Sequence, residues 1–182
     1  DGARFANALV SLGCTPAEMT WRAGVDVLSF GLTKNGALAC EAVVFFDPAL
    51  AEAFPYQRKR AGHTLSKGRL LGAQLCVMLE NGHWLENARH ANAMAQRLRA
   101  GLIAAGARAP WPTQANEVCA MLPRRADAAL KAAGARYYDW GARSLPPGQA
   151  PSDGEVFVRL VCSFASTDAE IDRFVAVARA AV

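Results

Sequence analysis

The first part of the chain alternates short helical and extended patterns of apolar residues. Apolar side chains recur with helical spacing over residues 4–12, which predicts a helix that ends at Gly13. Two short apolar runs, 25–30 and 43–46, predict two strands joined by a glycine-bounded loop. This part of the chain therefore predicts mixed helix and strand.

Two segments carry helix-start signals. Thr15 precedes a proline and stands three residues before Glu18, the spacing of a capping box, so we predict a short helix over 15–24. Asp47 also precedes a proline, which is a favourable helix start, and predicts a helix over 47–60.

The middle of the chain contains two longer helical patterns. Residues 66–79 are strongly apolar but fall short of the roughly 20 residues that a membrane-spanning helix needs, so they predict a helix buried in the core. Residues 84–105 are rich in alanine, and their apolar positions repeat with helical spacing. They predict one long helix.

From residue 107 onward, short strands and helices alternate. The expected strands are 117–122, 136–140 and 155–164; the expected helices are 124–133 and one capped by Ser166 or Thr167; a loop rich in proline and glycine covers 144–154. We therefore predict an α/β fold in three parts: 1–80, a connecting helix over 81–106, and a small α/β unit over 107–182.

The composition is that of a globular protein. Of the 182 residues, 52% are hydrophobic and 20% are charged, far from the profile of a disordered chain. No signal peptide opens the sequence, and no apolar run is long enough to span a membrane. We expect a soluble, cytoplasmic protein without a membrane partner.

The five cysteines are odd in number and widely spaced. They show no C-x-x-C pairing and no histidine at zinc-ligand spacing, and most have apolar neighbours. We expect all of them to be reduced core residues, and we expect no metal site. They are Cys14, Cys40, Cys76, Cys119 and Cys162.

Positive charge is concentrated in one place. The net charge is +4, and the dense basic cluster is Arg58-Lys59-Arg60, followed by Lys67 and Arg69. The cluster is either a solvated helix face or an anion site for a phosphate, and composition leaves both open. No aromatic residues alternate with these charges, so we do not expect a nucleic-acid partner.

Three features are candidates for chemistry. Lys34 follows a predicted buried strand, where partial burial would lower the pKa of a lysine and make it nucleophilic; an ordinary loop lysine is the alternative. Asp1 and Arg4 are separated by two small residues, which would let a ligand ring approach closely; a surface ion pair is the alternative. Arg159 lies within an apolar strand, so it needs either a protein acid or an anionic ligand as partner.

Together these features resemble one family. The stretches Asp-Gly-Ala-Arg-Phe-Ala-Asn-Ala, Gly-Val-Asp-Val-Leu-Ser-Phe-Gly-Leu-Thr-Lys-Asn-Gly and Val-Arg-Leu-Val-Cys-Ser are similar to those of low-specificity L-threonine aldolases, within the β-eliminating lyases. The resemblance implies the aspartate-aminotransferase-like fold of PLP-dependent transferases. Residues 1–80 would be the rear part of the large domain that binds pyridoxal 5′-phosphate (PLP), and 107–182 the small C-terminal domain.

The resemblance also implies roles for five residues. Lys34 would form the Schiff base with PLP, and Asp1 would pair with the pyridine nitrogen and keep it protonated. Arg4 and Arg159 would hold the substrate carboxylate. Lys67, or a neighbour in the basic cluster, would meet the cofactor phosphate.

The implied function is PLP-dependent cleavage of L-threonine, L-allo-threonine or related β-hydroxy-α-amino acids to glycine and an aldehyde. The implied assembly is a homodimer or homotetramer. One alternative is another PLP reaction on the same scaffold, either β-elimination or transamination. The other is a non-catalytic basic module that binds nucleic acid through residues 58–69, for which binding would depend steeply on salt.

Family members are about twice as long as this chain. Their other half carries a glycine-rich phosphate loop and a histidine that stacks on the cofactor ring, and neither precedes Asp1 here. We therefore expect the chain to be a C-terminal half that is inactive alone.

Overall fold

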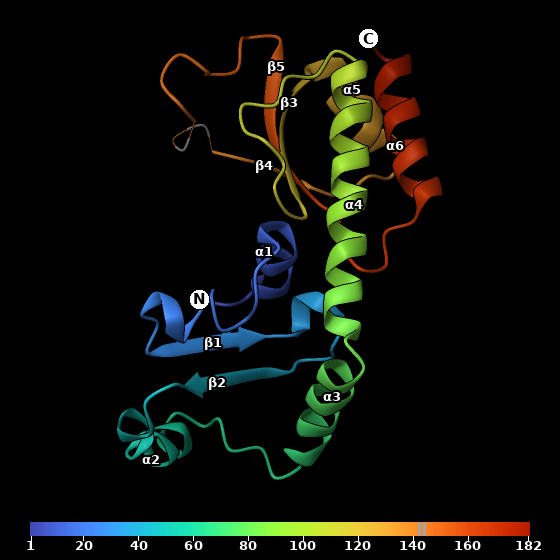
Figure 1. Cartoon of the computed structure of the whole chain (residues 1–182). Helices are drawn as coiled ribbons and strands as arrows, with labels where there is room; N and C mark the ends of the chain where they lie inside the picture. The colour runs from blue at the N-terminus through green and yellow to red at the C-terminus, as the bar shows by residue number, and fades with distance from the viewer. Residues whose placement is uncertain (142, 144) are drawn as a thin grey trace. The chain divides into compact units, whose positions relative to one another are not determined.

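The computed structural model describes residues 1–141, 143 and 145–182. The chain divides into two compact units, Asp1–Arg89 and His90–Val182 (Figure 1). The long helix α4 (His83–Ala104) begins in the first unit and continues in the second. The predicted α/β class and the single long helix are both confirmed.

The first unit is built on a two-stranded antiparallel sheet. Its strands, β1 (Val27–Gly31) and β2 (Glu41–Phe45), pair along their whole length. The other elements are the helices α1 (Phe5–Leu12), α2 (Phe54–Arg60) and α3 (Arg69–Glu80), and the 3₁₀ turns η1 (Trp21–Ala23), η2 (Thr33–Asn35) and η3 (Pro48–Ala51). The predictions of the first helix and of both strands are confirmed.

Three aromatic rings from distant segments form the centre of this unit. The rings of Phe5 and Trp84 stack with their centroids 6.4 Å apart. Phe30 meets both rings edge-on, at centroid distances of 5.8 and 5.7 Å. Such pairs stabilise a core beyond the burial of their area. They fix α1 and the start of α4 against β1.

The short helix predicted over 15–24 is wrong. Thr15 and Glu18 do form the hydrogen bonds of a capping box, but turns and η1 follow instead of an α-helix. The Pro16 carbonyl, which an α-helix would pair with the Thr20 N–H, accepts from the Thr20 hydroxyl at 2.6 Å, while the Thr20 N–H bonds to Ala17. A side chain thus competes with the helical bond.

The single helix predicted over 47–60 is also wrong, because it is divided into η3 and α2. Asp47 caps η3 as expected, with its carboxylate accepting from the Ala49 N–H at 2.9 Å. Pro55 lies in the first turn of α2 and has no N–H to donate to a preceding turn. A continuous helix would lose that bond, so the chain begins a new helix there.

Helix α3 forms where predicted, but it is not buried. None of its residues is buried, and Leu70 and Val77 are 60% and 53% exposed. Only the stripe of Leu75 and Met78 packs against the core of the first unit. The strongly apolar composition predicted a buried helix. In the first unit, however, only one side of α3 packs against the core, and the rest of its surface is uncovered.

The second unit is a three-stranded antiparallel sheet with helices. The strand order is β3–β5–β4, and every neighbouring pair is antiparallel. Its elements after α4 are β3 (Glu117–Pro123), α5 (Arg124–Ala132), β4 (Tyr138–Asp139), β5 (Glu155–Val161) and α6 (Asp168–Ala180). All five were predicted, β4 and β5 with longer bounds. Of the predicted loop 144–154, residues 145–154 contain no helix or strand, and Ser144 lies outside the described residues.

The core of the second unit lies on one face of its sheet. Val118 and Val158, both fully buried, come from β3 and β5, and Leu102, Leu130 and Ile171 of α4, α5 and α6 belong to the same cluster. Because side chains alternate along a strand, Glu117, Cys119 and Arg159 face the other side. The apolar alternation of β5 therefore leaves Arg159 outside this core.

The prediction that all five cysteines are core residues is wrong for three of them. All five are free, but only Cys40 and Cys162 are buried. Cys14 and Cys119 are half-buried, and Cys76 is exposed on α3. Burial raises the pKa of the Cys162 thiol to about 11, which makes it an inert core residue.

Candidate active site

The segment Asp1–Arg4 lies alongside the strand that leads to Lys34. The Gly2 N–H donates to the Ser29 carbonyl at 2.8 Å, and the Gly31 N–H donates to the Gly2 carbonyl at 3.4 Å. Gly2 and Phe30 thereby form a parallel bridge. Two candidate segments separated in sequence are brought together on β1.

Gly2 lets the two backbones approach. A Cβ atom at this position would collide with the Ser29 carbonyl oxygen and lie 2.7 Å from Cδ1 of Leu28. The sequence suggested that this small residue leaves room for a ligand ring. In the structure, the absence of a side chain at Gly2 lets its backbone lie against β1. Asp1 is exposed, and its carboxylate accepts from the Ala3 N–H at 2.9 Å. Arg4 is half-buried at the start of α1.

Lys34 lies in η2 and its side chain is exposed, so the predicted partial burial is wrong. The geometry of the turn explains the error. Residues three apart share a face of a 3₁₀ turn, and here Leu32 and Asn35, at 0% and 4% exposure, occupy the buried face. Lys34 falls between them and points to the surface.

Sequence reasoning missed two asparagines that contact this turn. The Asn35 side chain donates to the Trp84 carbonyl at 2.7 Å, and the Asn87 side chain donates to the Asn35 carbonyl at 2.9 Å. Asn35 stands between a lysine and a glycine, a sequence that is typical of any exposed turn. Nothing in the sequence therefore indicated that Asn35 is buried.

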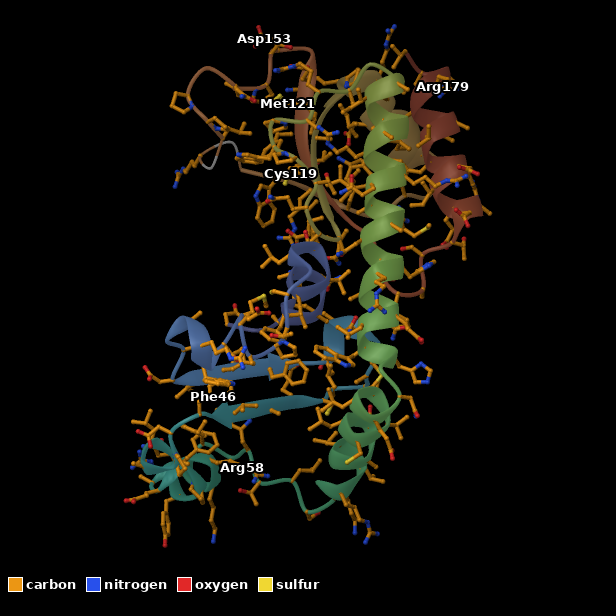
Figure 2. The ribbon with its side chains drawn as sticks, viewed as in Figure 1. Phe46, Arg58, Cys119, Met121, Asp153 and Arg179 are labelled. Carbon is orange, nitrogen blue, oxygen red and sulfur yellow. The ribbon has the colours of Figure 1, made fainter. Side chains whose placement is uncertain are left out.

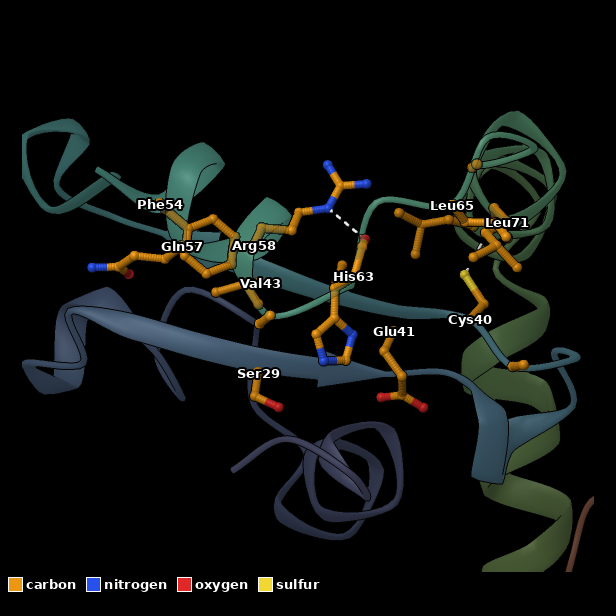
Figure 3. Close-up of a pocket in the computed structure, with 16 residues that line it drawn as sticks. Ser29, Cys40, Glu41, Val43, Phe54, Gln57, Arg58, His63, Leu65 and Leu71 are labelled. Atoms are coloured by element: carbon orange, nitrogen blue, oxygen red, sulfur yellow. Dashed lines mark hydrogen bonds between the residues drawn. The ribbon is translucent and has the colours of Figure 1, made fainter. Parts of the chain in front are cut away.

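One member of the basic cluster, Arg58, lines a cavity of about 740 Å³ in the first unit. Arg58 of α2 (Figure 2) and His63 line it, and the Arg58 guanidinium donates to the His63 carbonyl at 3.0 Å. The side chains of His63, Glu41 and Ser29 all lie along this cavity (Figure 3). Lys67, the candidate for the phosphate, is exposed between α2 and α3.

Arg159 has protein partners in the second unit. Its guanidinium lies 3.2 Å from a carboxylate oxygen of Glu117 and 4.4 Å from the ring centroid of Trp140. In the sheet, Arg159 stands opposite Cys119 of β3 (Figure 2) and Tyr138 of β4. Burial raises the pKa of the Cys119 thiol, Glu117 raises it further, and Arg159 opposes both.

Of the two partners considered for Arg159, the structure thus supplies a protein acid. The side chains of Arg159 and Glu117 are 27% and 31% exposed, so solvent still reaches the pair. The other four candidates, Asp1, Arg4, Lys34 and Lys67, belong to the first unit, and three of them are grouped around β1.

The described residues contain neither a metal-binding cluster nor a membrane-spanning helix. No group of three or more His, Cys, Asp or Glu side chains in this part of the chain is arranged to hold a metal ion. No helix within the same residues has the length and apolar character needed to cross a membrane.

Known proteins resemble this chain closely. The family model for "Beta-eliminating lyase" matches residues 1–124. The low specificity L-threonine aldolase of Pseudomonas sp. (strain NCIMB 10558) is 48% identical over 151 residues, which are 80% of this chain and 43% of that protein. The low specificity L-threonine aldolase of Pseudomonas aeruginosa is 44% identical over 181 residues, which are 98% of this chain and 48% of that protein.

A solved structure agrees with these relatives. The threonine aldolase of Leishmania major superposes with a TM-score of 0.86 at 32% identity, covering 99% of this chain and 50% of that one. The PLP-dependent transferase fold expected from the resemblance is confirmed. The chain spans about half the length of the curated relatives it matches. On the matched residues and on the fold together, the chain belongs to the β-eliminating lyase family.

Proposed function

We propose that the whole protein carrying this chain is a PLP-dependent aldolase. It would cleave L-threonine, L-allo-threonine or related β-hydroxy-α-amino acids to glycine and an aldehyde. The single observation that carries the proposal is the Gly2–Phe30 bridge, which holds the segment Asp1–Arg4 against the strand leading to Lys34. The names of the relatives, both low specificity L-threonine aldolases, support the same reaction.

The residues around β1 fit the cofactor chemically. A carboxylate, an amine and a guanidinium are the groups that a protonated pyridine, an aldehyde and a substrate carboxylate require. Lys34 is exposed in η2, shortly after β1, so its amine is accessible for a covalent bond. In this proposal Asp1 keeps the pyridine nitrogen protonated, Lys34 is the attachment point, and Lys67 meets the phosphate. When bound, PLP supplies an electron sink for the bond that breaks.

Arg4 and Arg159 are the proposed ligands of the substrate carboxylate. By holding this carboxylate, the two arginines would orient the amino acid and so determine which bond at Cα is placed for cleavage. Arg159 already pairs with Glu117. An incoming substrate carboxylate would therefore either bind the guanidinium beside Glu117 or displace Glu117 from it. Stacking on Trp140 holds the guanidinium plane during the exchange.

We also propose a cytoplasmic homodimer or homotetramer. Five free cysteines are typical of a protein from a reducing compartment. The exposed apolar residues of α3 offer area that a second subunit would cover.

The test is covalent trapping of the cofactor. The whole protein is incubated with PLP, reduced with borohydride and digested, and pyridoxyl-lysine is located by mass spectrometry. We expect the label on the peptide with Lys34, while the peptide with Lys131 serves as an internal reference. A folded protein without any label on Lys34 would refute the proposal.

β-Elimination is the second candidate, because the matching family model is that of β-eliminating lyases. One substrate distinguishes the two reactions. Aldol cleavage of L-threonine yields glycine and acetaldehyde, whereas elimination of its hydroxyl yields ammonia and a 2-oxo acid. Quantifying all four products after incubation with L-threonine decides between them, and we expect glycine and acetaldehyde in equal amounts.

A further inference from the structure

We propose that Asn35 and Asn87 are positioning residues that fix the turn carrying Lys34 by tying it to the start of α4. The inference rests on the proposed role of Lys34 as the attachment point of the cofactor. It goes beyond that role because it assigns the alignment of the lysine to two side chains whose contacts are with the protein backbone.

The two contacts run in opposite directions between the same two segments. The amide nitrogen of Asn35 donates to the main-chain carbonyl of Trp84 at 2.7 Å. The amide nitrogen of Asn87 donates to the main-chain carbonyl of Asn35 at 2.9 Å. Each segment thus contributes one side-chain donor and one backbone acceptor, and a turn held at two points on a helix does not rotate freely about either bond.

The Asn35 bond is buried and the Asn87 bond is part-buried, so both determine the position of the turn. Asn35 is 4% exposed and lies beside the core of Phe30 and Trp84. A buried amide that loses its partner retains the full cost of leaving water, so alternative positions of the turn are unfavourable. The backbone N–H of Asn35 also donates to the Leu32 carbonyl at 2.9 Å. This bond connects Asn35 to the residue that directly follows β1.

Lys34 needs an anchor of this kind because it has little packing of its own. Its side chain is exposed, and the next residue after Asn35 is Gly36, with φ at 114°. Glycine allows the backbone many other conformations here. Covalent chemistry tolerates only small errors in position, so the direction of Lys34 has to come from its neighbour.

The test uses isosteric variants of the whole protein. Asn87→Asp keeps the shape of the side chain but replaces the donor with an oxygen that faces the Asn35 carbonyl. Asn81→Asp adds the same charge at an exposed asparagine after α3 and is the matched control. Two quantities are measured: the PLP concentration that half-saturates borohydride labelling of Lys34, and hydrogen exchange of residues 32–38 without PLP.

For Asn87→Asp we expect the half-saturating PLP concentration to rise about tenfold, the size expected when a part-buried hydrogen bond is lost. Exchange should accelerate in residues 32–38, with the remainder of residues 1–89 unchanged, and Asn81→Asp should behave as wild type. Unaltered labelling and exchange in Asn87→Asp would overturn the inference alone. Faster exchange throughout residues 1–89 would also overturn it, because the asparagines would then hold the fold and not the turn. Absence of label on Lys34 in the wild-type protein would overturn the proposed function and this inference together.

Discussion

At the scale of single residues, Gly2 occupies a position with space for a hydrogen atom but not for a methyl group. We expect Gly2→Ala to lower the free energy of unfolding by about 2 kcal/mol, because the added Cβ meets backbone and not a flexible side-chain end. Urea unfolding of the whole protein measures the change. Gly72→Ala in α3 is the control: nothing lies within 4 Å of its Cβ, so a small stabilisation is expected there. Equal effects at both positions would contradict the close approach.

Arg159 can be tested by a change that keeps its charge. Arg159→Lys removes the planar guanidinium that stacks on Trp140 and can grip a carboxylate through two bonds. We expect the KM for L-threonine to rise by roughly tenfold or more, with a smaller effect on kcat. Arg179→Lys, at the exposed end of α6, should leave both constants unchanged. An unchanged KM in Arg159→Lys would remove this residue from the proposed site.

The sequence selects Lys34 as a candidate through its specific motif and the short apolar strand before it, and the role of this lysine stays a prediction. The surroundings of Lys34 could not be predicted. Its exposure depends on which residues of η2 contact the core, and that depends on Trp84 and Asn87, far along the chain. Local patterns contain no information on such long-range contacts.

At the scale of elements, α6 shows how a local signal succeeds. Thr167 and Glu170 form a complete capping box, each side chain accepting from the backbone N–H of the other. We expect Thr167→Ala to reduce stability by about 1 kcal/mol, as measured by urea unfolding. Thr64→Ala, at an exposed threonine outside helices and strands, should have no measurable effect.

The start of β5 carries a pH-dependent contribution to stability. Hydrogen bonds from Arg108, at 2.9 and 2.7 Å, lower the pKa of Glu155 to about 2, with burial opposing and Ser152 adding to the effect. Because the folded-state pKa lies below that of the unfolded chain, this stability is complete above about pH 5 and is lost as the pH falls toward 2.

We expect Glu155→Gln to be less stable than wild type at neutral pH by about 2 kcal/mol, and the difference to shrink as the pH falls below about 4. Urea unfolding at a series of pH values measures this. Asp153→Asn, at an exposed carboxylate two residues away, is the control. A difference that stays constant with pH would contradict the assignment of the pKa shift to the native pair.

Elements were predictable where one local signal dominated. The cap of α6 and the strands of the second sheet follow from residues adjacent in sequence. The failures over 15–24 and 47–60 arose where a side chain or a proline competed with helical hydrogen bonding. For α3, the composition predicted the helix but not its exposure, because exposure depends on what else covers it.

At the scale of the whole molecule, the chain contains two compact units whose boundary falls inside α4. The division expected from the sequence, into 1–80, a connecting helix over 81–106 and 107–182, and the assignment of these parts to a large and a small PLP domain both stay predictions. Light scattering on the whole protein tests the proposed assembly. We expect the mass of a dimer or tetramer, and a monomer would contradict it.

The anchored turn also has a consequence for how the protein ages. An asparagine followed by glycine is chemically fragile, because the glycine amide nitrogen attacks the side-chain carbonyl and releases ammonia. Asn35 precedes Gly36, and its bond to Trp84 directs the side chain toward α4. Attack on that carbonyl requires the turn to open. Deamidation would replace the donor with a carboxylate, which repels the Trp84 carbonyl and keeps the turn from closing again. The rate at which a stored sample deamidates at Asn35 would therefore increase with the fraction of time that the turn beside Lys34 is open.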